Sequence, residues 1–128
     1  MIMNDVVPIR FKPGFRKDAI IRYASRGREG IYSIEIREDE RIEIYLTHNP
    51  EELSPKLGFT VVGKHLRALP IGSTLDTKRG IFYWQPGPGF VGEYEYIFLM
   101  QDNFGQLSKK TLRVKINPKY SRRITTIR

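Results

Sequence analysis

Apolar and polar side chains alternate with a period of two along much of this sequence, and that pattern restricts the chain to β-structure. Residues 32–36 place a tyrosine and two isoleucines on one face and a serine and a glutamate on the other. The alternation resumes over residues 42–46, after the acidic residues 38–40. A half-buried strand needs this arrangement because successive side chains point to opposite faces of a sheet. The short separation predicts that the two runs form a hairpin.

Prolines and glycines divide the remaining sequence into short segments. Residues 47–56 contain Pro50 and Pro55 and are predicted to be a loop. The longest predicted strand, 93–101, alternates at first and then becomes apolar on both faces, as in a strand that is central or covered on both sides. Only residues 16–24 show a helical period, and it is weak. Further strands are predicted at 57–62, 65–69, 77–79, 81–85 and 107–116.

About seven short strands separated by turns predict an all-β antiparallel sandwich or barrel. The length of 128 residues fits one domain, which we place at residues 6–117. Residues 1–5 are interpreted as an N-terminal linker and residues 118–128 as a basic C-terminal tail.

The positive charge of the chain is concentrated in its second half. The formal net charge is +8. Residues 1–64 hold eleven Lys or Arg against ten Asp or Glu, whereas residues 65–128 hold eleven against four. Basic residues along the last strand and tail are most simply explained as solubilising and edge-protecting side chains. Nucleic-acid binding ranks behind that explanation because no nucleic-acid-binding motif accompanies the charge.

The sequence leaves the cellular compartment open. It contains no cysteine, so no disulfide holds the fold. The longest apolar run, residues 96–100, is far shorter than the roughly 20 residues of a membrane-spanning helix. Residues 1–5 do not form a signal peptide. An exported protein would therefore carry its signal upstream in a longer parent chain.

A series of short motifs lies between residues 69 and 105. The series contains a Leu-Pro-x-Gly step, a Leu-Asp step, a glycine before an aromatic strand ending in Trp-x-Pro, a Gly-x-Tyr step and an Asp-x-x-Gly turn. The residues that carry it are Leu75, Asp76, Gly80, Trp84, Pro86, Gly92, Tyr94, Asp102 and Gly105. In this order the motifs resemble bacterial immunoglobulin-like and dystroglycan-type cadherin-like repeats, and the likeness is clear over residues 57–116. It implies an immunoglobulin-like Greek-key sandwich of about seven strands, used as a module of bacterial cell-surface or secreted proteins.

These motif residues are interpreted as determinants of the fold. Trp84 is the only tryptophan and is predicted to fill the core between the sheets. Gly92 is expected to permit a corner into the Tyr94 strand, which resembles the tyrosine corner of such sandwiches. Asp102 and Gly105 suit a turn whose carboxylate accepts hydrogen bonds from local amides.

Calcium is the one cofactor that the resemblance raises, and the sequence favours a metal-free module. The candidate ligands are Asp76, Asp102 and Asn103. Calcium takes six to eight oxygen ligands, and the acid-rich segments of calcium-binding relatives are absent from this sequence. We therefore interpret the three residues as parts of structural turns.

No constellation of residues points to catalysis, so the chain is predicted not to be an enzyme. His48 and His65 are the only histidines, and no nucleophile, zinc-binding or phosphate-binding motif accompanies them. The predicted function is a non-catalytic spacer, docking or adhesion module, whose partners are neighbouring modules or another surface protein. The alternative is a module that binds polysaccharide or another anionic polymer through Lys109, Lys110, Arg113 and Lys115 and through the loop aromatics Phe15 and Phe90. For the two phenylalanines we favour the simpler interpretation that they tuck under the sheets as lids.

Overall fold

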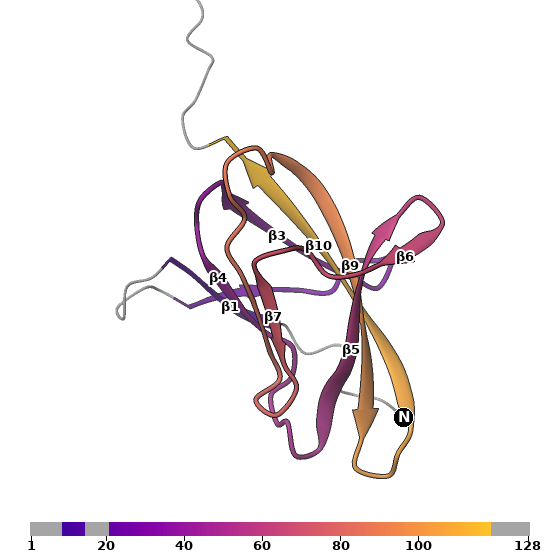
Figure 1. The fold of residues 1–128 in the computed structure, drawn as a ribbon. Coiled ribbons are helices and arrows are strands. Elements are labelled where there is room, and N and C mark those ends of the chain that lie inside the picture. The colour runs from indigo at the N-terminus through magenta and orange to yellow at the C-terminus, as the bar shows by residue number, and fades with distance from the viewer. Residues whose placement is uncertain (1–8, 15–20, 119–128) are drawn as a thin grey trace, which may run out of the picture.

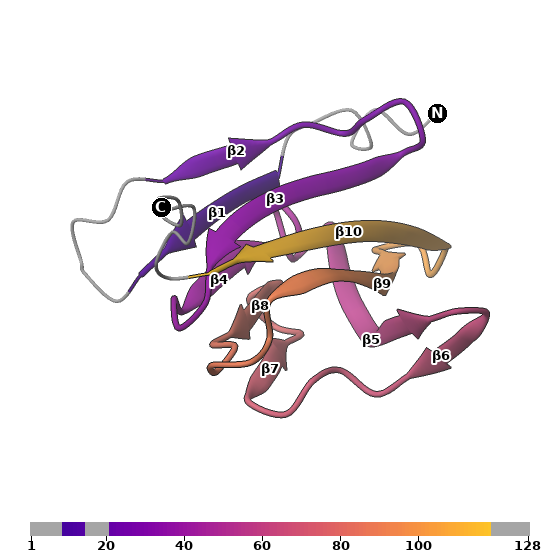
Figure 2. The same cartoon turned by 90° about the horizontal axis from the view of Figure 1, so that it is seen from above.

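The computed structural model describes residues 9–14 and 21–118, which form two β-sheets packed face to face (Figures 1 and 2). The described residues contain no helix. The prediction of an all-β sandwich is therefore confirmed. The ten strands of this part of the chain are β1 (Ile9–Pro13), β2 (Arg22–Ala24), β3 (Ile31–Arg37), β4 (Ile42–Tyr45), β5 (Leu53–Val62), β6 (His65–Arg67), β7 (Ser73–Asp76), β8 (Ile81–Trp84), β9 (Gly92–Asp102) and β10 (Leu107–Asn117).

Each sheet contains five strands. The first has the order β2-β1-β4-β8-β7, and all its pairs are antiparallel. The second has the order β3-β10-β9-β5-β6. Its pairs are antiparallel except for β3 and β10, which run parallel from Ile31 beside Thr111 to Arg37 beside Asn117.

The predicted alternation is borne out in the burial of side chains. Tyr32, Ile34 and Ile36 of β3 are buried, and the residues between them are exposed. Ile42 and Ile44 of β4 are fully buried. As predicted, Trp84 lies in the core with 1% of its surface exposed, and its ring packs edge-on against Tyr96 with the centroids 5.5 Å apart. Apolar side chains from both sheets thus form one core.

The hairpin predicted from residues 32–46 does not form. Strand β3 pairs with β10 in one sheet, and β4 pairs with β1 and β8 in the other. The intervening turn contains Asp39 at φ 69° and carries the chain from one sheet to the other. The physical reason is that both runs are apolar on one face, and these faces cover each other across the core. Alternation specifies that face but not the neighbouring strand.

Other boundaries also differ from the prediction. Strand β5 begins at Leu53, inside the predicted 47–56 loop, and tolerates Pro55 because the register shifts between Pro55 and Leu57. The strand predicted at 77–79 is the turn after β7. Residues 22–24, at the end of the weak helical candidate, form β2 instead.

The described chain enters and leaves at opposite ends of the sandwich. The turns at 47–52, 77–80 and 102–106 lie together at one end, called here the 102–106 end (Figure 1). Ile9 lies at this end, since Arg10 pairs with Tyr45 at the end of β4. Asn117 lies at the other end, where its carbonyl accepts a hydrogen bond from the Glu38 amide.

Candidate functional site

Strand β10 carries the predicted cationic residues, but they do not share one face. Lys109, Arg113 and Lys115 point outward from the second sheet, in phase with the exposed positions of the strand. Lys110 points inward, with 9% of its surface exposed. Its Nζ donates a hydrogen bond to the Leu46 carbonyl at 2.7 Å and lies 5.6 Å from the centre of the Tyr32 ring. Lys110 therefore has a structural contact at the edge of the core.

Two of the outward cations face carboxylates on neighbouring strands. Arg113 Nη2 lies 3.7 Å from Glu95 Oε1, and Lys115 Nζ lies 3.9 Å from Glu35 Oε2. Exposed pairs of this kind contribute little to stability. They do offset charge, so the outer surface of β10 is not the continuous cationic strip that the sequence alternative requires.

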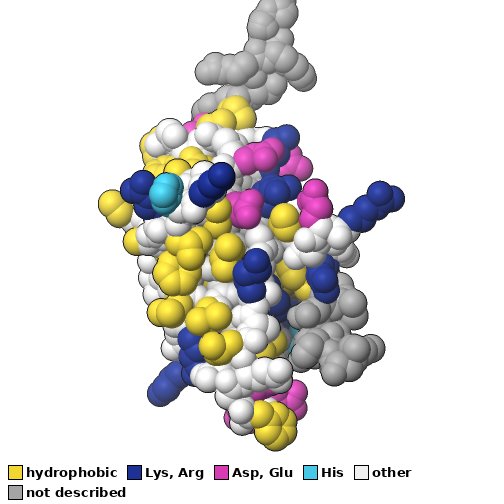
Figure 3. Space-filling model, turned by 90° about the vertical axis from the view of Figure 1, so that its right-hand side faces the viewer, with side chains coloured by type: hydrophobic (Ala, Val, Ile, Leu, Met, Phe, Trp, Pro, Cys, Tyr) yellow, Lys and Arg dark blue, Asp and Glu magenta, His cyan; other side chains and the backbone are white. Residues whose placement is uncertain are grey.

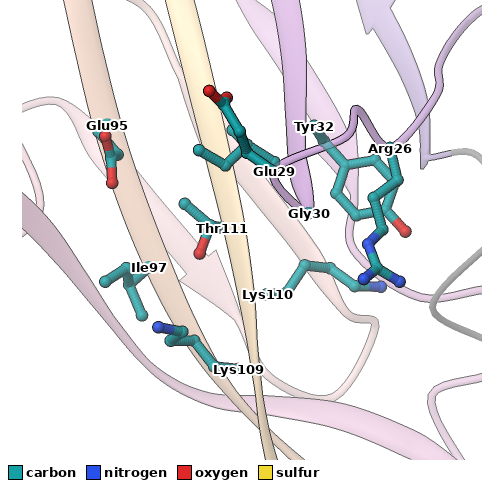
Figure 4. A pocket seen from close by; sticks show the side chains of 10 residues that line it. Arg26, Glu29, Gly30, Tyr32, Glu95, Ile97, Lys109, Lys110 and Thr111 are labelled. Atoms are coloured by element: carbon teal, nitrogen blue, oxygen red, sulfur yellow. The ribbon is translucent and has the colours of Figure 1, made fainter. Parts of the chain in front are cut away.

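A hollow of about 360 Å³ lies beside the first residues of β10, where β3 has not yet begun (Figure 4). Arg26 and Lys110 project on the same side of β10 as the Tyr32 ring, and Lys109 projects on the other side. The side chains that line the hollow include Arg26, Lys109 and Lys110 and also the carboxylates of Glu29 and Glu95. Because the cations diverge and acids share the rim, the hollow is a weak candidate for a phosphate or carboxylate site.

Phe90 lies as the favoured interpretation of a lid over the core predicts, rather than as an exposed stacking platform. Phe90 packs edge-on against Trp84, with ring centroids 6.0 Å apart, and covers the end of the core. Phe15 lies outside the described residues. Among the described residues, the most exposed large apolar side chains are Ile71 at 94% and Phe104 at 89%, both in turns. Sequence reasoning did not single these two out, although each stands beside a turn glycine.

The three calcium candidates form hydrogen bonds with backbone groups of the turns. Asp76 Oδ1 accepts hydrogen bonds from the amides of Lys78 at 3.1 Å and Arg79 at 3.0 Å. Asp102 Oδ1 accepts from the amides of Phe104 at 2.9 Å and Gln106 at 2.8 Å. The Asn103 amide donates to the Glu52 carbonyl at 3.0 Å. Within residues 9–14 and 21–118, no group of three or more His, Asp or Glu side chains is arranged to hold a metal ion.

The other motif residues pack at the core or shape turns. Leu75 and Tyr94 pack against the core, and the Tyr94 ring lies edge-on to Trp84 with centroids 5.7 Å apart. Gly80 has φ 74° and is buried. Three further motif residues are Pro86, which is buried, Gly92, which has φ 139°, and Gly105, which has φ 84°. These contacts belong to the fold rather than to a binding site.

A carboxylate network on the outer face of the first sheet was not identified from sequence. Glu43 accepts hydrogen bonds from Arg41 Nη1 at 2.7 Å and from the Tyr45 hydroxyl at 3.0 Å. Burial raises the pKa of the Glu43 carboxyl, but these hydrogen bonds and the Arg41 charge outweigh it and hold the pKa below its ordinary value. Burial and the bond to Glu43 raise the pKa of Tyr45. A general base works best with a pKa near neutrality, and the lowered pKa of Glu43 moves away from that value. We therefore interpret the Glu43–Tyr45 pair as a structural surface contact.

The outer face of the second sheet carries an unexpected row of apolar side chains. Six of them lie on adjacent strands and come from β5, β6 and β9: Leu57, Phe59, Val61, Leu66, Ile97 and Leu99. We call these residues the apolar face. The sequence held a signal for it, since strand 93–101 becomes apolar on both sides, and β9 is indeed central in its sheet.

Comparison with models of known protein families gives no match, and comparison with the curated proteins gives none either. The part of the chain that the structure describes has no helix long and apolar enough to cross a membrane.

Proposed function

We propose that the chain is a non-catalytic structural and interaction module, an immunoglobulin-like Greek-key sandwich from a longer bacterial surface or secreted protein. Within that protein it acts as a spacer and docking domain between neighbouring modules. The observation that carries the proposal is the position of Ile9 and Asn117 at opposite ends of the sandwich.

The order of strands supports the immunoglobulin-like assignment. Constant-type immunoglobulin sandwiches place strands A, B, E and D in one sheet and C, F and G in the other. Taking β1 as A, β4 as B, β5 as C, β7 as D, β8 as E, β9 as F and β10 as G gives the orders A-B-E-D and C-F-G. The remaining strands extend these sheets at their edges. The register of β9 against both neighbours also fits a central F strand.

The distance between the two ends supports the spacer role. Strands β9 and β10 each have eleven residues, and a strand advances by roughly 3.3 Å per residue. A module entered at one end and left at the other would therefore add roughly 35 Å to an extended chain of modules. Modules whose termini lie at one end cannot lengthen a chain in this way.

The sequence alternative of anionic-polymer binding has less support. Of the four basic residues it invokes, Lys110 is buried, and Arg113 and Lys115 face Glu95 and Glu35. Salt-sensitive retention of the chain on an acidic polysaccharide column would favour this alternative, and passage through the column at low salt would count against it.

A replacement experiment in the parent protein tests the spacer proposal. Residues 9–117 would be deleted, or replaced by an unrelated sandwich domain of equal length whose termini also lie at opposite ends. A spacer predicts that deletion impairs the parent protein and that replacement restores it. If the replacement does not restore the parent protein's function, the module has a specific binding role instead. Protease treatment of intact cells tests the location, because a surface module is digested while a cytosolic control protein survives.

A further inference from the structure

The apolar face is a continuous patch rather than a set of isolated surface leucines. Leu57 and Leu66 expose 52% and 56% of their surfaces. They adjoin half-buried neighbours, because Leu57 pairs with Leu99 and Leu66 pairs with Val61. Figure 3 shows hydrophobic side chains in a band down this side of the molecule, with Lys and Arg side chains on both sides of the band. Contiguous apolar patches of this kind mark interaction sites in soluble proteins.

Four exposed basic residues border the apolar face: Lys56, Lys64, Arg67 and Lys109. At one end of the face, Lys109 pairs with Leu99 in the register of β9 and β10, and Lys56 directly precedes Leu57. At the other end, Lys64 and Arg67 lie within two residues of Leu66. None of the four forms an ion pair within residues 9–14 and 21–118. Cations without an acidic partner therefore stand at both ends of the face.

The acids on the same side of the sheet do not offset these four cations. Along the five strands of the second sheet, the outward acids are Glu35, Glu93 and Glu95. Glu95 pairs with Val61 but faces Arg113 at 3.7 Å, and Glu35 faces Lys115 at 3.9 Å. Glu93 pairs with Lys115 in the register, beyond the apolar rows. The surroundings of the apolar face are thus positive, which disfavours a second copy of this chain and favours an acidic partner.

The apolar face is also narrow. It extends over four residues of β5, from the Leu57–Leu99 pair to the Val61–Leu66 pair, which corresponds to roughly 14 Å. Its three strands, β6, β5 and β9, span roughly 10 Å from first to last. An α-helix of about ten residues has a similar length and a diameter of about 10–12 Å. The face is far smaller than the roughly 800 Å² per partner of a standard interface between folded proteins.

We propose that the apolar face binds a short amphipathic helix that carries an apolar stripe and has carboxylates near both of its ends. Apolar residues at positions i, i+3, i+4 and i+7 of the helix would contact the face. Carboxylates in its first and last turns would then lie near Lys56 and Lys109 at one end and near Lys64 and Arg67 at the other. The inference goes beyond the proposed spacer role, which depends on the ends of the sandwich.

The outward acids favour a helix over an anionic membrane. Glu93 and Glu95 lie on the same strand and on the same side as Ile97. A flat anionic surface that covered Ile97 would also approach these two carboxylates, which it would repel. A helix lying over β5, β6 and the Ile97–Leu99 part of β9 covers the apolar rows without extending over Glu93.

Two synthetic helical peptides of about 14 residues test the proposal. Both carry leucines at i, i+3, i+4 and i+7; one has glutamates in its first and last turns, and the other has lysines there. The full chain is titrated into each fluorescently labelled peptide, and the anisotropy is measured. The glutamate peptide should bind at least about 10-fold more tightly at low salt. The difference should shrink as salt rises, because exposed charges are screened.

Two double variants separate the apolar and the charged contributions. Leu57→Ser/Leu66→Ser leaves the net charge unchanged and should weaken binding of the glutamate peptide at least about 10-fold, since it removes two exposed leucines of the face. Lys56→Glu/Lys109→Glu should cancel the preference for the glutamate peptide, because one end of the face becomes acidic while the other stays basic.

The matched control is Arg22→Glu/Lys78→Glu. It changes the net charge as much as Lys56→Glu/Lys109→Glu does, at exposed positions on β2 and in the turn after β7, both of which belong to the first sheet. It should therefore keep the preference for the glutamate peptide. Fluorescence of the buried Trp84 confirms that each variant is folded.

Three results would overturn the inference: equal binding of the two peptides, no binding of either peptide at millimolar concentration, or an equal loss of preference in both charge variants. Binding to phosphatidylglycerol vesicles that Leu57→Ser/Leu66→Ser abolishes, with no binding of the glutamate peptide, would assign the face to a membrane instead. A dimer that the same variant dissociates would assign it to a second copy. The replacement experiment on the parent protein is independent of all these outcomes.

Discussion

Gly80 has little room for a side chain, so substitution by alanine gives a sharp test of the packing at the 102–106 end. Its amide donates to the Asp76 carbonyl at 2.8 Å, and its carbonyl accepts from the Leu46 amide at 2.8 Å. These bonds hold its backbone at φ 74°. A Cβ placed there would overlap Thr47 Cγ2 and would also lie 3.7 Å from Pro50 Cβ and 3.7 Å from Pro55 Cδ.

The expected loss has two parts. An alanine in the left-handed region costs about 1–2 kcal/mol, and forcing extra volume into packed surroundings costs about 1–3 kcal/mol. Gly63→Ala isolates the first part, because Gly63 has φ 62° and its Cβ would meet no atom of the described chain within 4 Å. Gly80→Ala should therefore lose about 1–3 kcal/mol more of the free energy of unfolding than Gly63→Ala does. The effect on unfolded-state entropy is common to both substitutions and cancels.

Urea unfolding followed by the fluorescence of the single tryptophan, Trp84, measures this difference. The double variant Gly80→Ala/Thr47→Ser removes the overlapping methyl group and keeps the Thr47 hydroxyl that accepts from the Asn49 amide at 3.2 Å. It should recover most of the difference. Equal losses for Gly80→Ala and Gly63→Ala, or no recovery in the double variant, would refute the packing argument.

Three further predictions concern polar groups. Tyr96→Phe should raise the free energy of unfolding by about 1 kcal/mol, because the Tyr96 hydroxyl is buried and has no hydrogen-bond partner among the described residues; a clear loss in urea unfolding would contradict this. Glu43→Gln should lower the free energy of unfolding, and the loss should be largest near neutral pH. Folding lowers the pKa of Glu43 from its ordinary value of 4.5, so the stabilisation by its carboxylate is fully present above that value and disappears as the pH falls through the lowered pKa. Urea midpoints of both proteins at neutral and strongly acidic pH should therefore converge in acid, and a constant difference would count against the network. Millimolar calcium should leave the melting temperature unchanged against EDTA and magnesium controls, because one oxygen of Asp76 and one of Asp102 each already accept two backbone amides; a calcium-specific rise would restore the metal-binding interpretation.

The sequence predicts the buried faces of the strands better than it predicts their neighbours. Alternation identified Tyr32, Ile34 and Ile36 as core residues, since burial follows directly from the period of two. It could not show that β3 pairs with β10, which lies about 80 residues away along the chain. Turn chemistry normally supplies such information, and the acidic 38–40 segment carries no hairpin signature.

The binding residues proposed from sequence were grouped by charge rather than by face. Lys110 has the same phase in its strand as Leu112, Val114 and Ile116, so alternation alone would have placed it inward, apart from Lys109. Its contact with the Leu46 carbonyl depends on a segment 64 residues away. That partner, like the carboxylates beside Arg113 and Lys115, follows from the sheet order and is not encoded in local sequence.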